Sequence, residues 1–144
     1  MTATKQVRRL GLFIALVVSL FALSACDPVL EQADLSSLNA LRTGQGLSAL
    51  VRDAALDRKA SAQAVRMARQ EAIFHSTDLK LGVPDGWTVI GENVGVGGSI
   101  VTIQDALKNS PSHLANMVDP RFRRVGIGAV ERNNRIYLVQ VFVG

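Results

Sequence analysis

Residues 124 to 142, RVGIGAVERNNRIYLVQVF, contain two runs rich in β-branched and aromatic residues. Between the runs stand Asn133 and Asn134, which tolerate the positive φ angles of a tight hairpin turn. In the second run apolar side chains alternate between two faces, with Ile136, Leu138 and Phe142 on one and Tyr137, Val139 and Val141 on the other. A strand that is apolar on both faces must be covered on both sides, so the chain is expected to fold in at least three layers.

The segments before this hairpin predict the covering layers. Leu35, Leu38 and Leu41 share one face of a helix that GQG at 44–46 ends, and small alanines recur along a longer helix between 53 and 71. A loop at 82–86 precedes the strand-like WTVIGENVGVGG, and 100–110 predicts a third helix broken by Pro111. We therefore expect an α+β fold, a three-layer α-β-α sandwich with a mostly antiparallel sheet.

The start of the chain has a different character. Three basic residues and no acid precede an unbroken apolar run over 10–23 that is too short for a comfortable membrane span. The run ends in LSAC, where small residues precede Cys26, the only cysteine, and this pattern resembles a bacterial lipobox. The resemblance implies cleavage after Ala25 and a diacylglycerol on Cys26; the alternative is a free buried thiol in an uncleaved anchor.

These features divide the chain into a lipoprotein signal peptide (1–25), a lipidated cysteine with a short tether (26–34) and one domain (35–144). The net charge of +4 comes from 16 Lys and Arg against 12 Asp and Glu, and removal of three bases with the signal leaves 13 − 12 = +1. No basic run with interleaved aromatic residues remains, so nucleic acid is not an expected partner. RFRR at 121–124 is expected to be a solvated turn rather than a contact with anionic lipid.

Three polar side chains fall at the boundaries of the predicted elements: His75, Glu92 and His113, the two histidines being the only ones in the chain. Two neutral imidazoles and a carboxylate suit a divalent cation, and they also suit proton transfer. The alternatives are structural: a capping or core histidine at 113, and a Glu92 carboxylate bound to backbone N–H groups. Asn93 is expected to support the turn.

A series of short motifs resembles one protein family. In order they are LNALR, the ladder of Leu50, Leu56, Ala60 and Ala64, then FHS, GENV, NSPSHLANM, RVGIGAV and YLVQVF. The chain from 35 to 144 is similar to the CAP or SCP-like domain of cysteine-rich secretory proteins, antigen 5 and plant pathogenesis-related proteins, and is most similar to its short bacterial branch.

The resemblance implies an α-β-α sandwich whose cleft joins two histidines and two acids and in some members holds a divalent cation. His75, Glu92 and His113 match three of these positions. Ser110 stands where the fourth, acidic residue is expected, and Leu107 replaces a tryptophan common there. We therefore expect a weak site for zinc or calcium, with Ser110 and Asn93 lining the cleft.

The function expected first is that of a lipid-anchored lipoprotein of the bacterial cell envelope, outside the cytoplasmic membrane. It would bind a divalent cation, a lipid or another small envelope or cell-wall ligand. One alternative is an envelope hydrolase that is metal-assisted or uses Ser76, Ser110 or Ser112, although serines at such positions are more often helix caps. The other is an interaction protein with a vestigial cleft.

Overall fold

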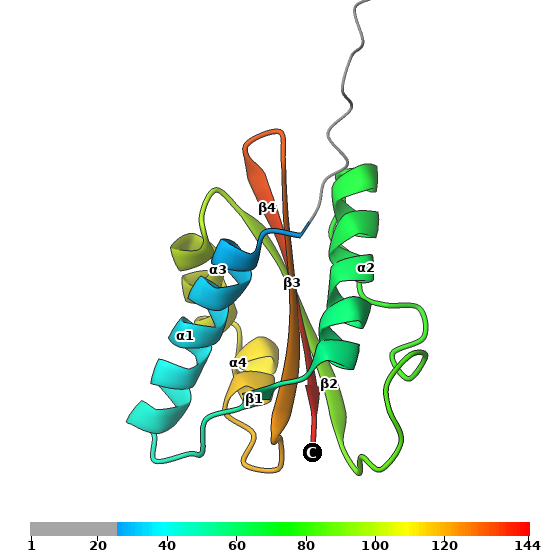
Figure 1. The fold of residues 1–144 in the computed structure, drawn as a ribbon. Helices are drawn as coiled ribbons and strands as arrows, with labels where there is room; N and C mark the ends of the chain where they lie inside the picture. The colour runs from blue at the N-terminus through cyan, green and yellow to red at the C-terminus, as the bar shows by residue number, and fades with distance from the viewer. Residues whose placement is uncertain (1–25) are drawn as a thin grey trace, which may run out of the picture.

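The computed structural model describes residues 26–144, so the predicted signal peptide lies outside the described residues. The elements in chain order are α1 (Pro28–Gly44), β1 (Val51–Arg52), α2 (Ala54–Gln70), β2 (Ile90–Gly97), α3 (Ile100–Lys108), α4 (Pro111–Met117), β3 (Arg124–Arg132) and β4 (Arg135–Val143) (Figure 1). The expected helices and the expected hairpin are present. Asn133 and Asn134 take positive φ angles of 50° and 56°, as the tight turn requires.

The four strands form one sheet in the order β1-β3-β4-β2. β4 pairs antiparallel with both β2 and β3, whereas the two-residue β1 runs parallel to β3. The sheet is therefore mixed, although mostly antiparallel as expected.

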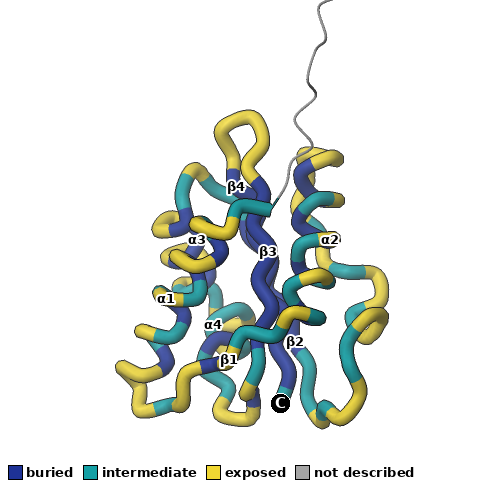
Figure 2. The backbone as a smooth tube through the Cα atoms, viewed as in Figure 1, coloured by how far each residue is buried: buried dark blue, intermediate teal, exposed yellow. Residues whose placement is uncertain are grey.

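Helices cover both faces of this sheet, so the three-layer prediction is confirmed. α2 covers one face, and α1, α3 and α4 cover the other (Figures 1 and 2). The two faces of β4 belong to separate cores: Ile136, Leu138 and Phe142 pack with α1, α3 and α4, and Tyr137, Val139 and Val141 pack under α2.

α2 lies directly on the backbone of β3. A Cβ added at Gly126 would come within 2.0 Å of the Leu56 carbonyl carbon, and one at Gly128 within 2.4 Å of that of Ala60. The fully buried Ala60 and Ala64 complete this contact from the helix side. Small residues on both partners therefore allow an approach that larger side chains would block.

The expected tether at 26–34 is wrong from Pro28 onward, because α1 begins there, with Asp27 as its N-cap. The Asp27 side chain accepts from the backbone N–H of Val29 at 2.8 Å, and proline is favoured at the first helical position. Asp34 is fully buried in this helix. The described domain therefore has no spacer between Cys26 and its first helix.

A buried arginine fixes the position of the chain after α4. Arg42 of α1 donates to the carbonyl oxygens of Ser48, Met117, Asp119 and Phe122, and it is fully buried. These bonds hold the end of α4 against α1. α4 itself was not predicted; Pro111 breaks α3 as expected but also begins the new helix.

Within residues 26–144, the core side chains described above and all helices and strands lie after Asp27, so a protein that begins at Asp27 keeps all of these contacts. Between residues 26 and 144, no helix is long and apolar enough to cross a membrane.

Candidate functional site

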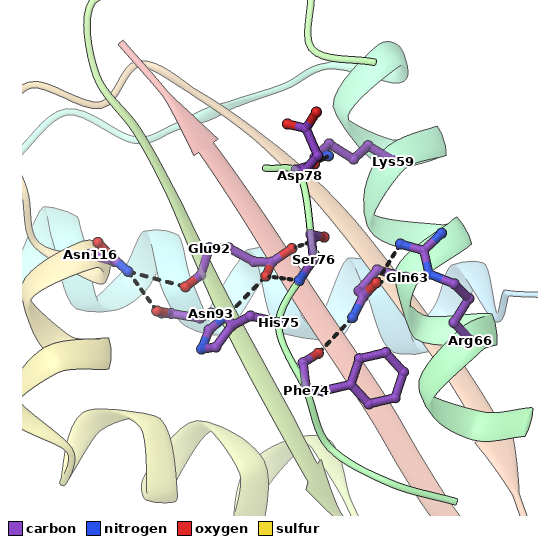
Figure 3. Close-up of polar contacts among 10 residues, drawn as sticks. All are labelled: Lys59, Gln63, Arg66, Phe74, His75, Ser76, Asp78, Glu92, Asn93 and Asn116. Atoms are coloured by element: carbon purple, nitrogen blue, oxygen red, sulfur yellow. Dashed lines mark hydrogen bonds and ion pairs between the residues drawn. The ribbon is translucent and has the colours of Figure 1, made fainter. Parts of the chain in front are cut away.

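Glu92 of β2 is the centre of the polar site. Its side chain is only 3% exposed, and its carboxylate accepts three hydrogen bonds from the segment after α2 (Figure 3). Oε1 accepts from His75 Nδ1 at 2.9 Å and from the backbone N–H of Ser76 at 2.8 Å, and Oε2 accepts from Ser76 Oγ at 2.5 Å. Both carboxylate oxygens are therefore used in holding residues 75 and 76 against β2.

The same segment is also fastened to α2. Gln63 Nε2 donates to the Phe74 carbonyl oxygen at 2.6 Å, and Lys59 Nζ donates to the carbonyl oxygens of Asp78 and Leu81 at 2.9 and 2.8 Å. His75 consequently has a fixed backbone, although 58% of its side chain is exposed.

His113 approaches the site from α4. Its Nδ1 lies 2.9 Å from Ser110 Oγ. Burial lowers the pKa of His113 below its ordinary value, and the nearby His75 lowers it further. His75 and His113 therefore interact electrostatically.

Both imidazoles have Nδ1 occupied by a side chain of the protein. Neither Nε2 atom makes a hydrogen bond to any of the described residues. A ring whose other nitrogen is fixed in this way is oriented for a ligand at Nε2.

Asn93, which was expected to line the cleft, is fully buried behind it. Its Nδ2 donates to the His113 carbonyl oxygen at 3.1 Å and to Gln140 Oε1 at 3.2 Å. Its Oδ1 accepts from Asn116 Nδ2 at 2.9 Å (Figure 3). Asn93 therefore positions α4, and thereby His113, instead of contacting a ligand.

An apolar hollow of about 210 Å³ adjoins His113. Ile73, Ile103 and Leu107 line it, together with Ser110 and His113. Ser110 thus lies in the wall of this hollow.

The structure bears on two sequence predictions, the metal site and the serine nucleophiles. Among residues 26–144 no group of three or more His, Cys, Asp and Glu side chains is arranged to hold a metal ion. Ser76 Oγ is bonded to a carboxylate rather than to an imidazole, whereas Ser110 Oγ contacts His113. Ser112 reaches only Ser110, at 3.4 Å.

Comparison with known proteins gives the family. The sequence profile of the cysteine-rich secretory protein family, CAP, matches residues 35–143. The chain belongs to this family. No match is found among curated proteins.

Solved CAP structures share the fold. An extracellular SCP-domain protein of Bacillus anthracis is 21% identical, with a TM-score of 0.68 over 78% of this chain and 39% of that chain. An outer surface protein of Borrelia burgdorferi is 20% identical, with a TM-score of 0.68 over 78% of this chain and 90% of that one. NaASP2, solved with Zn²⁺, is 15% identical, with a TM-score of 0.59 over 82% and 80% of the two chains. The first of these is thus much longer than the present CAP domain.

Sequence reasoning missed several residues that hold the site in place. The amides of Asn116 and Gln140 and the side chain of Gln63 lie far along the chain from the groups that they hold. Gln140 did carry a signal, since it is the one polar residue in the apolar run 136–143.

Proposed function

We propose that the protein is an envelope lipoprotein, anchored through Cys26, whose CAP domain binds a small ligand between His75 and His113. The sequence before Cys26 supports the anchor, and because α1 begins at Pro28 the domain would follow the anchor directly. The secreted and surface relatives support a location outside the cytoplasmic membrane.

The observation that carries the proposal is the pair of imidazoles, each with Nδ1 bonded and Nε2 directed to no partner among the described residues. Such a pair fits a divalent cation, for which zinc is the first choice because it accepts imidazole nitrogen readily. Glu92 would act from behind, orienting His75 by its hydrogen bond. Water would complete the coordination of a weak site.

The apolar hollow beside His113 indicates that the ligand would also carry an apolar group. Its volume of about 210 Å³ is below the range of about 300–1,000 Å³ that is usual for drug-sized ligands, so it takes a short apolar group. A polar head at the histidines and a short apolar group beside Leu107 describe a small amphipathic envelope molecule.

The cation is tested on a protein that begins at Asp27 by thermal and urea unfolding with zinc. A cation that binds only the folded state at about 100 times its Kd adds about 2.7 kcal/mol to the free energy of unfolding. Protection should fade as the pH is lowered, because protons compete with the cation for the imidazole nitrogens. His75→Ala and His113→Ala should each remove most of it.

Ser110→Glu provides the gain-of-function arm, since it puts a carboxylate at the position where the family pattern has an acid. Ser112→Glu is the matched control, because it adds the same charge two residues away without contacting His113. Stronger protection by zinc in the first variant alone supports the site. Zinc that leaves both the wild type and Ser110→Glu unchanged would refute it.

A second candidate is a serine hydrolase, favoured by the contact of 2.9 Å between Ser110 Oγ and His113 Nδ1. It predicts covalent labelling of Ser110 by a fluorophosphonate, which Ser110→Ala abolishes and His113→Ala slows. If neither labelling nor ligand binding is found, the cleft is vestigial and the protein acts by contacts elsewhere.

A further inference from the structure

The exposed face of α2 carries cations with no acidic partner. Arg58, Arg66 and Arg69 lie on this side of the helix, and none forms a salt bridge within the described part of the chain. Arg66 donates only to the neutral Gln63 Oε1. The one acid within α2, Asp57, is already bonded to a different arginine. The face therefore has a local positive charge that the nearly neutral mature chain as a whole does not have.

A hollow of about 490 Å³ lies between this face and the loop after α2. Arg58, Lys59 and Arg66 line it against a single carboxylate, that of Asp78, so the balance is 3 − 1 = +2. The Asp78 carboxylate already accepts from two backbone N–H groups of its own turn, and Lys59 Nζ is held by two carbonyl oxygens. The hollow thus offers fixed positive charge to an anion the size of a phosphate-bearing headgroup.

An apolar side chain stands at the rim of the same hollow. Leu81 lines it and is 72% exposed. A large apolar side chain set among cations is the composition of surfaces that lie in the interface of an anionic membrane, where the cations meet headgroups and the apolar group enters the acyl boundary.

The anchor point adjoins this helix. The half-buried Cys26 packs among the side chains under α2, and its thiol lies beside Ser61 of that helix. The Asp27 N–H donates to the Ala129 carbonyl oxygen at 2.9 Å, and α1 begins at the next residue. A lipid on Cys26 would therefore keep the domain close to the bilayer, because no spacer separates Cys26 from α1.

We propose that the exposed face of α2, defined by Arg58, Arg66 and Arg69 with Leu81, docks on anionic phospholipid headgroups. The phosphate lies in the hollow lined by Arg58, Lys59 and Arg66, and Leu81 enters the interface. The orientation at a membrane rests on the proposed anchoring at Cys26, but the affinity of the surface for anionic lipid does not.

The test uses the protein that begins at Asp27, which carries no acyl chain, so it separates docking from anchoring. Its sedimentation with vesicles of phosphatidylcholine alone is compared with vesicles that also contain phosphatidylglycerol, at low and high salt. We expect binding only to the anionic vesicles, weakened by salt. Arg58→Gln, Arg66→Gln and Arg69→Gln together should reduce the partition coefficient on the order of 100-fold, at about five-fold for each arginine near the surface.

The matched control removes three other exposed arginines, Arg121, Arg123 and Arg135, and therefore the same charge. It should lose far less binding than the α2 variant. Leu81→Ser should weaken binding several-fold at unchanged charge. Equal binding to neutral and anionic vesicles, or equal loss in the two triple variants, would overturn the proposal.

Discussion

Asp34 allows a quantitative test of the buried polar network. It is fully buried in α1, where its carboxylate accepts from Gln140 Nε2 at 2.8 Å and from Gln104 Nε2, and it has no salt bridge among the described residues. Burial raises the pKa of Asp34 from an ordinary value of 3.8 to about 6, although the two amides oppose the rise. An anionic carboxylate in this position is therefore a cost to the fold near neutral pH.

The sign follows from proton linkage. The folded protein binds this proton more tightly than the unfolded chain, so the stabilisation by Asp34 is complete below about pH 3.8 and is lost as pH rises through about 6. The shift of 6 − 3.8, about two units, corresponds to about 3 kcal/mol at about 1.4 kcal/mol per unit. Because Asp34 is fully buried, solvent does not screen this contribution to the free energy of unfolding.

The assay is urea unfolding of wild type and Asp34→Asn from about pH 4.5 to about pH 7.5, followed by circular dichroism. As pH rises, the free energy of unfolding of the variant should increase relative to that of the wild type. The increase should be most of the expected value of about 3 kcal/mol. A constant offset from repacking of the amides does not affect this slope. A difference that stays constant within about 0.5 kcal/mol would refute the raised pKa.

Asp53→Asn is the matched control. Burial raises the pKa of Asp53, but hydrogen bonds from Leu56, the Arg124 guanidinium and Ala55 outweigh it and hold the pKa below the ordinary value of 3.8. Its stabilisation is lost only as pH falls through that low range. Its difference from wild type should therefore be flat in the window where the difference for Asp34→Asn changes.

Three further predictions concern the fold and the anchor. Gly128→Val should destabilise by about 3 kcal/mol or more in thermal or urea unfolding, because the backbone of α2 occupies the place of the new side chain, whereas Gly98→Ala, which adds a Cβ in open space, should be nearly neutral. Leu138→Asp and Val139→Asp should each cost several kcal/mol, since they bury a charge in opposite cores; tolerance of either within about 0.5 kcal/mol would contradict the two-sided burial of β4. Cys26→Ser should abolish metabolic labelling with a fatty acid, and equal labelling of wild type and variant would exclude lipidation at this position.

The sequence predicted the elements whose signals are local. The asparagine pair specifies the turn between β3 and β4, the alternation from Ile136 to Phe142 specifies a strand with two cores, and the helical spacing of Leu56, Ala60 and Ala64 specifies the inner face of α2. Each of these patterns uses neighbours within one element, so no knowledge of the rest of the chain is needed.

The candidate site was predictable only in part. His75 and His113 were recognised because they are rare and stand at element boundaries, and in the structure the charge of His75 lowers the pKa of His113. The hydrogen bonds from Ser76 and His75 to both Glu92 oxygens were not predictable. The sequence shows that a glutamate is present, but not whether its carboxylate faces a metal or a backbone N–H.

By itself, therefore, the sequence determined the layers, the hairpin and the family, since these follow from periodicity and from short motifs in order. Only the tertiary structure decided that residues 28–34 are helix and not tether, because Asp34 is matched by amides 70 and 106 residues away. Polar residues near a chain terminus read as a solvated linker until their partners are known. The buried position of Asn93 and the unpaired cations of α2 have the same cause: whether a polar side chain is satisfied depends on groups that only the fold brings to it.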